Sequence, residues 1–185
     1  MGATCATVYD TRQAMQLIRC TEKLRKEMGL KKSELAETVI SSSRLGQWHA
    51  NLIYIDRKKC VLFANDLTLF NFIVPDLKRA HIRELDKIFR QFLTTVVNSE
   101  PDLAGVAQKI VEEHATIEFA STNNRSVLGS MNDLAYQYTY LILERGGVHS
   151  PYVPEIIKSQ NRLPMGALNH MHAIEAVKKV YKVTG

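Results

Sequence analysis

The sequence predicts an α+β fold in which helices pack on a small, mostly antiparallel sheet of about four strands in a single domain. Two observations predict it. Residues 48–55 alternate between two faces and are followed by a polar turn and a second apolar run, as in a β-hairpin. Residues 82–97 instead repeat their apolar side chains every three or four positions, as in an amphipathic helix. Strands and helices therefore occur in runs and do not alternate strictly.

The first part of the chain predicts a strand followed by helices. Residues 1–14 are small and polar without periodicity, so we expect an N-terminal extension, with the domain spanning residues 15–185. Residues 16–20 suit a short strand. Thr21 then offers an N-cap and Gly29 a C-terminal stop for a helix. A second short helix is expected over residues 34–39.

The rest of the chain supplies the sheet and the remaining helices. The hairpin turn is expected at residues 56–59, a third β-like run at 68–74 and another strand at 115–121. Helical periodicity resumes after Leu134 and stops at a pair of glycines. The remaining expected elements are helices at residues 82–97, after 102, after Pro154 and over 173–181, with a turn at 163–166.

Composition excludes several classes of protein. Of the 185 residues, 45% are hydrophobic and 23% are charged, which is ordinary for a globular chain and excludes disordered and fibrous classes. No apolar run approaches the ~20 residues that span a bilayer, so no membrane partner is expected. The three cysteines are widely spaced and match neither a disulfide framework nor a zinc ribbon. Reduced thiols and the lack of an apolar leader predict a cytoplasmic location.

Signatures of familiar chemistry are missing from the sequence. None of the six histidines has metal-ligand spacing, and HExxH and CxxC motifs do not occur. No glycine-rich loop matches a P-loop or a dinucleotide fingerprint. The sequence therefore predicts no metal and no cofactor. Cys20 and Cys60 lie on apolar strands and are expected to be buried and unreactive.

The stretch NNRSVLGSMNDL, residues 123–134, carries the densest group of polar side chains. We interpret it as a strand-to-helix junction, where unpaired backbone N–H groups and a partial positive charge favour an anion. The candidate ligand-binding residues are Arg125, Ser126, Gly129, Ser130 and Asn132. Alternatively, Arg125 pairs with a protein carboxylate and the amides only satisfy loop backbone.

Residues from the predicted strands are candidates to flank this junction. Arg19, Trp48 and Arg57 would lie beside the anion. His49 is the candidate general base, because its pKa lies near neutrality, with Asp133 or Asp66 as helper. A lone strand histidine is more often structural. The formal net charge of +5 is dispersed, and its tightest run, residues 57–59, is either a solvated turn or a phosphate contact.

Four segments resemble a bacterial family that is known only as a domain of unknown function. They contain RCTEKL, WHANLIYIDR, LFANDLTLF and RSVLGSMND, and the resemblance covers roughly residues 15–182. It implies a compact single domain that begins near Met15. It implies no activity, substrate or catalytic residue.

Three functions remain open from the sequence. The first is a binding module at residues 123–133, whose ligand is an anionic or nucleotide-like small molecule or a nucleic acid. The second is a hydrolase or transferase that uses His49 as its base. The third is a protein-interaction accessory protein, of a mobile-element or toxin–antitoxin type, which would form a homodimer or expose an apolar patch.

Overall fold

The computed structural model describes residues 15–37 and 39–183, so the predicted extension at residues 1–14 lies outside the described residues. A five-stranded sheet forms the centre, in the order β4-β3-β2-β1-β5. The strands are β1 (Met15–Cys20), β2 (Trp48–Ile55), β3 (Lys58–Asn65), β4 (Asn71–Val74) and β5 (Thr116–Ser121). The predicted α+β single domain is confirmed, with five strands in the main sheet where four were expected.

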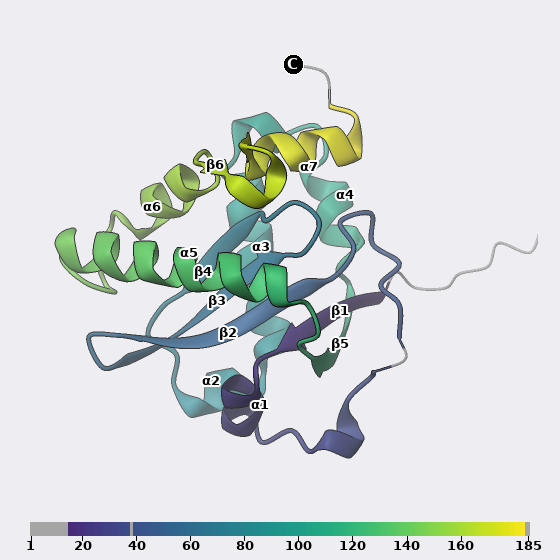
Figure 1. Ribbon diagram of the computed structural model, residues 1–185, viewed down its shortest axis with the longest axis vertical. Coiled ribbons are helices and arrows are strands. Elements are labelled where there is room, and N and C mark those ends of the chain that lie inside the picture. The colour runs from purple at the N-terminus through teal and green to yellow at the C-terminus, as the bar shows by residue number, and fades with distance from the viewer. Residues whose placement is uncertain (1–14, 38, 184–185) are drawn as a thin grey trace, which may run out of the picture.

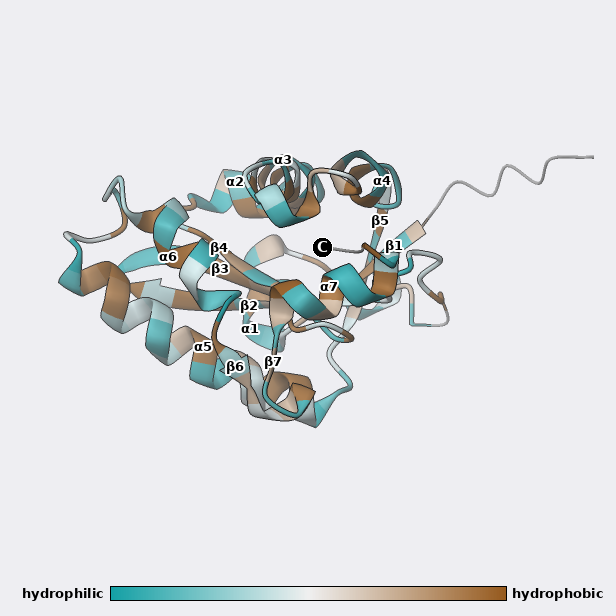
Figure 2. Ribbon diagram, turned by 90° about the horizontal axis from the view of Figure 1, so that it is seen from above, coloured by the Kyte–Doolittle hydropathy of each residue, from teal (hydrophilic) through white to brown (hydrophobic). Residues whose placement is uncertain are grey.

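Helices cover both faces of this sheet (Figures 1 and 2). Those on one face are α2 (Arg79–Arg83), α3 (Leu85–Asn98) and α4 (Ala107–Glu112). The long helix α5 (Arg125–Glu144) crosses the other face. The remaining helices are α1 (Glu22–Met28), α6 (Val153–Gln160) and α7 (Ala173–Tyr181). A two-stranded hairpin, β6 (Pro164–Met165) and β7 (Met171–His172), joins α6 to α7.

The sheet is mixed. β2, β3 and β4 pair antiparallel, whereas β1 pairs in parallel with both β2 and β5. Parallel neighbours need a long crossover, and α1 with the loop after it supplies one between β1 and β2. β1 therefore lies between two segments that are distant in sequence, and its side chains meet residues from both.

The alternation in β2 assigns its two faces. Trp48 faces α3, where its ring lies 5.1 Å from that of Phe89 and 5.7 Å from that of Phe72. Phe63 stacks on Phe72 at 5.1 Å between ring centroids, which completes an aromatic cluster under α3. His49 projects to the opposite face, which α5 covers. Trp48 and Phe63 therefore belong to the core, because they fill the layer between sheet and helix, whereas Tyr54 of the same hairpin is exposed.

One local prediction is wrong, and a second is confirmed in its position alone. Residues 34–39 were expected to form a helix, but the structure has a single 3₁₀ turn at Lys32–Glu34. The backbone N–H of Ala36 instead donates to the carbonyl of Phe119 at 2.8 Å, so this segment covers the edge of β5. Thr21 is the N-cap of α1, as predicted, but its side chain makes no capping hydrogen bond. Its hydroxyl donates to Oδ1 of Asn51 at 3.1 Å.

Candidate functional site

The junction between β5 and α5 is shorter than the sequence predicts. α5 begins at Arg125, so residues 125–134 are its first turns and not a loop. Asn124 is the N-cap, and its Oδ1 accepts hydrogen bonds from the backbone N–H groups of Ser126 (3.0 Å) and Val127 (3.3 Å). Two amides of the helix start are therefore already satisfied by the protein, as an N-cap requires.

The polar residues of this helix start differ in how exposed they are to solvent. Arg125, Ser126, Gly129, Asn132 and Asp133 are exposed, and Ser130 is half-buried. Within residues 15–37 and 39–183, Arg125 makes no ion pair, so the alternative in which a protein carboxylate holds it finds no partner there.

A small hollow of about 150 Å³ lies beside this start of α5. Ser126, Ser130 and Asn124 line it from the helix, and Asp66 and Leu67 line it from the turn after β3. Asp133 lines a second hollow against the β6 hairpin, together with Pro164 and Met165, and Ser130 borders both hollows. Arg125, Gly129 and Asn132 line neither. The helix thus contributes two hydroxyls to the first hollow, and the Ser130 hydroxyl and the Asp133 carboxylate to the second.

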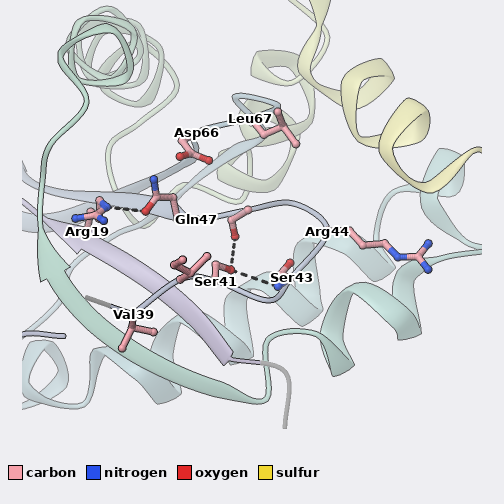
Figure 3. Close-up of a pocket in the computed structure, with 10 residues that line it drawn as sticks. Arg19, Val39, Ser41, Ser43, Arg44, Gln47, Asp66 and Leu67 are labelled. Carbon is pink, nitrogen blue, oxygen red and sulfur yellow. Dashed lines mark hydrogen bonds between the residues drawn. The ribbon is translucent and has the colours of Figure 1, made fainter. Parts of the chain in front are cut away.

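A larger cavity of about 390 Å³ adjoins the small hollow, because Asp66 and Leu67 line both (Figure 3). Arg19 contributes from β1, and Gly46 and Gln47 contribute from the loop before β2. The remaining lining residues are Val39, Ile40, Ser41, Ser43 and Arg44. We call this volume the Arg19 cavity.

Arg19 is held rigidly although it carries a charge inside the sheet. The parallel register aligns it with His49 on one side and Ala120 on the other, on the face that α5 covers. The side chain is buried, its Nε donates to Oε1 of Gln47 at 2.6 Å, and Nη1 donates to the carbonyl of Ser121 at 2.9 Å. Glu37 lies 3.7 Å from Nη1. Among the described residues, Nη2 has no hydrogen-bond acceptor, and it remains available to a ligand.

Asp66 lies on the other side of Gln47 from Arg19 (Figure 3). Its backbone N–H donates to the carbonyl of Gln47 at 3.0 Å. Burial raises the pKa of the Asp66 carboxyl, while the Gln47 side chain and the Arg19 charge act in the opposite direction. Gly46 has φ of +71°, and a Cβ there would lie 3.2 Å from Oδ1 of Asp66. Glycine therefore allows the carboxylate to lie against the loop backbone.

Glu113 fixes the loop that forms the far wall of the Arg19 cavity. Its Oε2 accepts hydrogen bonds from the Ser43 hydroxyl (3.3 Å), the Arg44 backbone N–H (2.9 Å) and the Tyr181 hydroxyl (2.7 Å). Ser41 donates to the carbonyl of Gly46 at 2.7 Å within the same loop. The wall is thus tied to α4 and α7, and the cavity is largely formed in advance.

Two predicted flanking residues lie elsewhere. Trp48 is fully buried under α3, on the face of the sheet opposite Arg19, and cannot contact a ligand there. Arg57 lies in the hairpin turn at the far end of β2, about 23 Å along the strand at a rise of about 3.3 Å per residue. Neither residue lines the Arg19 cavity or the small hollow.

His49 is buried and lines neither cavity. Neither of its ring nitrogens has a hydrogen-bond partner among the described residues. Burial, with a smaller contribution from the Arg19 charge, lowers the pKa of His49 to about 4, so the ring is neutral at pH 7. A base must reach the proton it removes, and this side chain is closed off from both cavities.

Gln47 and Gly46 were missed by the sequence interpretation, and Asp66 was named only as a helper. Gln47 immediately before β2 and Asp66 immediately after β3 were the available signal, since adjacent antiparallel strands bring such ends together. Arg19 was identifiable because it interrupts an apolar strand. Among the described residues, no cluster of histidine, cysteine, aspartate or glutamate could hold a metal ion. No helix in that part of the chain has the length and apolar character needed to cross a bilayer.

Comparison with protein families identifies one match. Residues 17–176 match the model of a domain of unknown function, DUF6933. The chain belongs to this family. The predicted membership of a family of unknown function is therefore confirmed, and the matched residues include Arg19 and Asp66. Searches of curated proteins and of solved structures found no significant match.

Proposed function

We propose that this DUF6933 protein binds a small phosphorylated, nucleotide-like molecule across the Arg19 cavity and the adjoining hollow at the start of α5. The observation that carries the proposal is that the two spaces share Asp66 and Leu67. A single ligand can therefore place one end against Arg19 and Gln47 and the other against Ser126 and Ser130. The larger space, about 390 Å³, is within the range of small-molecule sites, about 300–1,000 Å³.

The phosphate would lie at the α5 end. The hydroxyls of Ser126 and Ser130, which line the hollow, are the donors, and the helix dipole adds a favourable potential. Arg125 is in the same first turn of α5 but outside the lining, and it would add a positive charge. Asn124 already occupies two backbone amides, so side chains would supply most of the contacts. This proposal keeps Arg125, Ser126 and Ser130 from the sequence interpretation. It assigns no contact to Gly129 or Asn132.

Nucleic acid is a weaker candidate for the partner. Lys58 and Lys59, in the tightest basic run, are paired with Asp76 at 3.5 Å and with Glu27 respectively. A phosphate backbone would have to compete with these carboxylates. The hydrolase alternative loses support because His49 is enclosed and lines neither cavity.

Differential scanning fluorimetry with a ligand panel tests the proposal. The panel contains inorganic phosphate, pyrophosphate, the nucleoside monophosphates and a single-stranded oligonucleotide. A ligand at 100 times its Kd adds about 2.7 kcal/mol of stability, which raises the Tm by several degrees. Arg125→Ala should reduce the shift, whereas Arg83→Ala, an exposed arginine on α2, should not. The proposal is wrong if no phosphorylated small molecule raises the Tm of the wild-type protein.

A further inference from the structure

The rim of the Arg19 cavity is unusually apolar for an exposed surface. Ile40 is 88% exposed and Leu67 is 53% exposed, and both line the cavity. Val39, which precedes Ile40 in the chain, lies on the side of the cavity away from Leu67 (Figure 3). Large apolar side chains left in water around a polar cavity are typical of a site that closes on a flat or apolar ring.

The floor between these apolar sides is polar and asymmetric. Arg19 offers Nη2, which has no acceptor among the described residues, and Asp66 offers carboxylate acceptors, on opposite sides of Gln47 (Figure 3). Gln47 accepts from Arg19 through Oε1 at 2.6 Å, so its amide holds the two charged groups apart. Arg19 and Asp66 therefore do not form an ion pair with each other. A ligand that satisfies both needs an acceptor near Arg19 and donors near Asp66.

We propose that the Arg19 cavity binds the base of a guanine nucleotide, with the ring between the Ile40 and Leu67 sides and its polar edge on Asp66 and Arg19. Guanine places O6 and N7 acceptors on one side, which suit an arginine, and its N2 amine is a donor. The neighbouring N1–H is a second donor, so one carboxylate can accept both. Adenine presents one amine donor beside ring nitrogen acceptors and matches this pair less well. The inference rests on the proposed function, because the phosphate would occupy the α5 hollow.

Isothermal titration calorimetry with GMP, IMP and AMP tests the base. IMP lacks the N2 amine, so we expect it to bind about 10-fold more weakly than GMP, and AMP about 100-fold more weakly, for hydrogen bonds to a charged group. Asp66→Asn should remove most of the preference for GMP over AMP. Asp56→Asn is the matched control, because Asp56 is exposed in the hairpin turn at the far end of β2 and lines neither space, and it should leave the preference intact.

A second pair of variants tests the apolar sides without touching the polar floor. Ile40→Ser should weaken GMP binding several-fold and leave the binding of inorganic phosphate unaffected, because Ile40 lines the Arg19 cavity and not the hollow at the start of α5. Leu143→Ser, at an exposed apolar position on α5, should change neither affinity. Equal affinity for GMP and AMP, or binding of phosphate with no gain from the base, would overturn the guanine inference and leave the phosphate site standing. Failure of every phosphorylated ligand would overturn the proposed function itself.

Discussion

The indole Nε1 of Trp48 donates a hydrogen bond to Nε2 of His114 at 3.0 Å inside the core. Because this nitrogen accepts, the ring proton must be on Nδ1, which lies 2.6 Å from the carbonyl oxygen of Ile110. Both ring nitrogens are therefore used in the neutral tautomer. Burial lowers the pKa of His114 to about 4, and a second proton would break the bond to Trp48.

His114→Leu should destabilise the protein by about 1–3 kcal/mol at pH 7.5, because it leaves the Trp48 N–H and the Ile110 carbonyl buried without partners. Urea unfolding measures the change. His172→Leu, at an exposed position, should stay within about 0.5 kcal/mol. A His114 variant as stable as that control would show that the buried pair contributes nothing.

Stability should fall as the pH drops from about 6.5 to about 4. His49 and His114 each have a folded pKa of about 4, against 6.5 for the unfolded chain, so unfolding takes up protons in this window. The stabilisation is complete above pH 6.5, and each histidine removes up to about 1.4 kcal/mol per pH unit below it. Urea unfolding at pH 7.5, 6 and 5 gives the slope, and His49→Leu should reduce it. An unchanged slope would mean that His49 titrates normally.

At neutral pH, His49→Leu should change the free energy of unfolding much less than His114→Leu does. No hydrogen bond to the His49 ring is present among the described residues, so an apolar side chain of similar volume costs little or stabilises. Nucleotide affinity should be unchanged, because His49 lines neither cavity. A large loss of binding in a folded His49→Leu protein would restore this histidine as a functional residue.

The elements that could be predicted are those with a local signal. The alternation in residues 48–55 and the apolar repeat in 82–97 are periodic within one element, and Gly29 ends α1 with φ of +79°. The helix predicted over residues 34–39 is wrong because the backbone N–H of Ala36 pairs with Phe119, far along the chain. The start of α5 was misplaced because Gly129 and Asn132 are poor helix formers, while buried packing along the helix outweighs their propensity.

The candidate site depends on contacts that no local pattern contains. Arg19 and Gln47 are 28 residues apart and meet because β1 and β2 pair in parallel, a register that the sequence did not predict. Asp66 joins them because β3 returns antiparallel beside β2. Polar density along residues 123–134 indicated the α5 end of the candidate site, which stays a prediction. The Arg19 end could not be predicted without knowing the order of the strands in the sheet.

Tyr138→Phe should destabilise the protein by about 1–3 kcal/mol. The buried hydroxyl of Tyr138 donates to Oδ1 of Asn71 at 2.7 Å, and Asn161 bridges the backbone N–H and carbonyl of Asn71. Removing the donor leaves a buried acceptor unsatisfied. The Tm should fall by roughly 2–4 °C for each kcal/mol lost. Tyr136→Phe, on the exposed side of the same helix, should leave the Tm unchanged; equal effects would exclude a special role for the buried network.

Asp66→Asn should raise the Tm of the free protein at pH 7 while it weakens nucleotide binding. Burial raises the folded pKa of Asp66 above its unfolded value of 3.8, so the ionised carboxylate opposes folding at neutral pH. This penalty is absent below pH 3.8 and develops as the pH rises through the folded pKa, so the advantage of asparagine should vanish in acid. Thermal scans from pH 7 to 3.5 measure it. A lower Tm at pH 7 would show that Asp66 stabilises the fold.

Two glycines at the site should respond oppositely to the same change. Gly129 is exposed within α5, and an added Cβ would meet no atom within 4 Å. Gly129→Ala should therefore stabilise the protein by about 0.4–1 kcal/mol and leave the Tm shift from GMP intact. Gly46→Ala places a Cβ 3.2 Å from Oδ1 of Asp66, at φ of +71°. It should therefore destabilise the protein and weaken the binding of GMP. If Gly129→Ala abolished the GMP shift in a stable protein, the ligand would approach α5 at Gly129, as the sequence alone predicted, and the boundary drawn at Ser126 and Ser130 would be wrong.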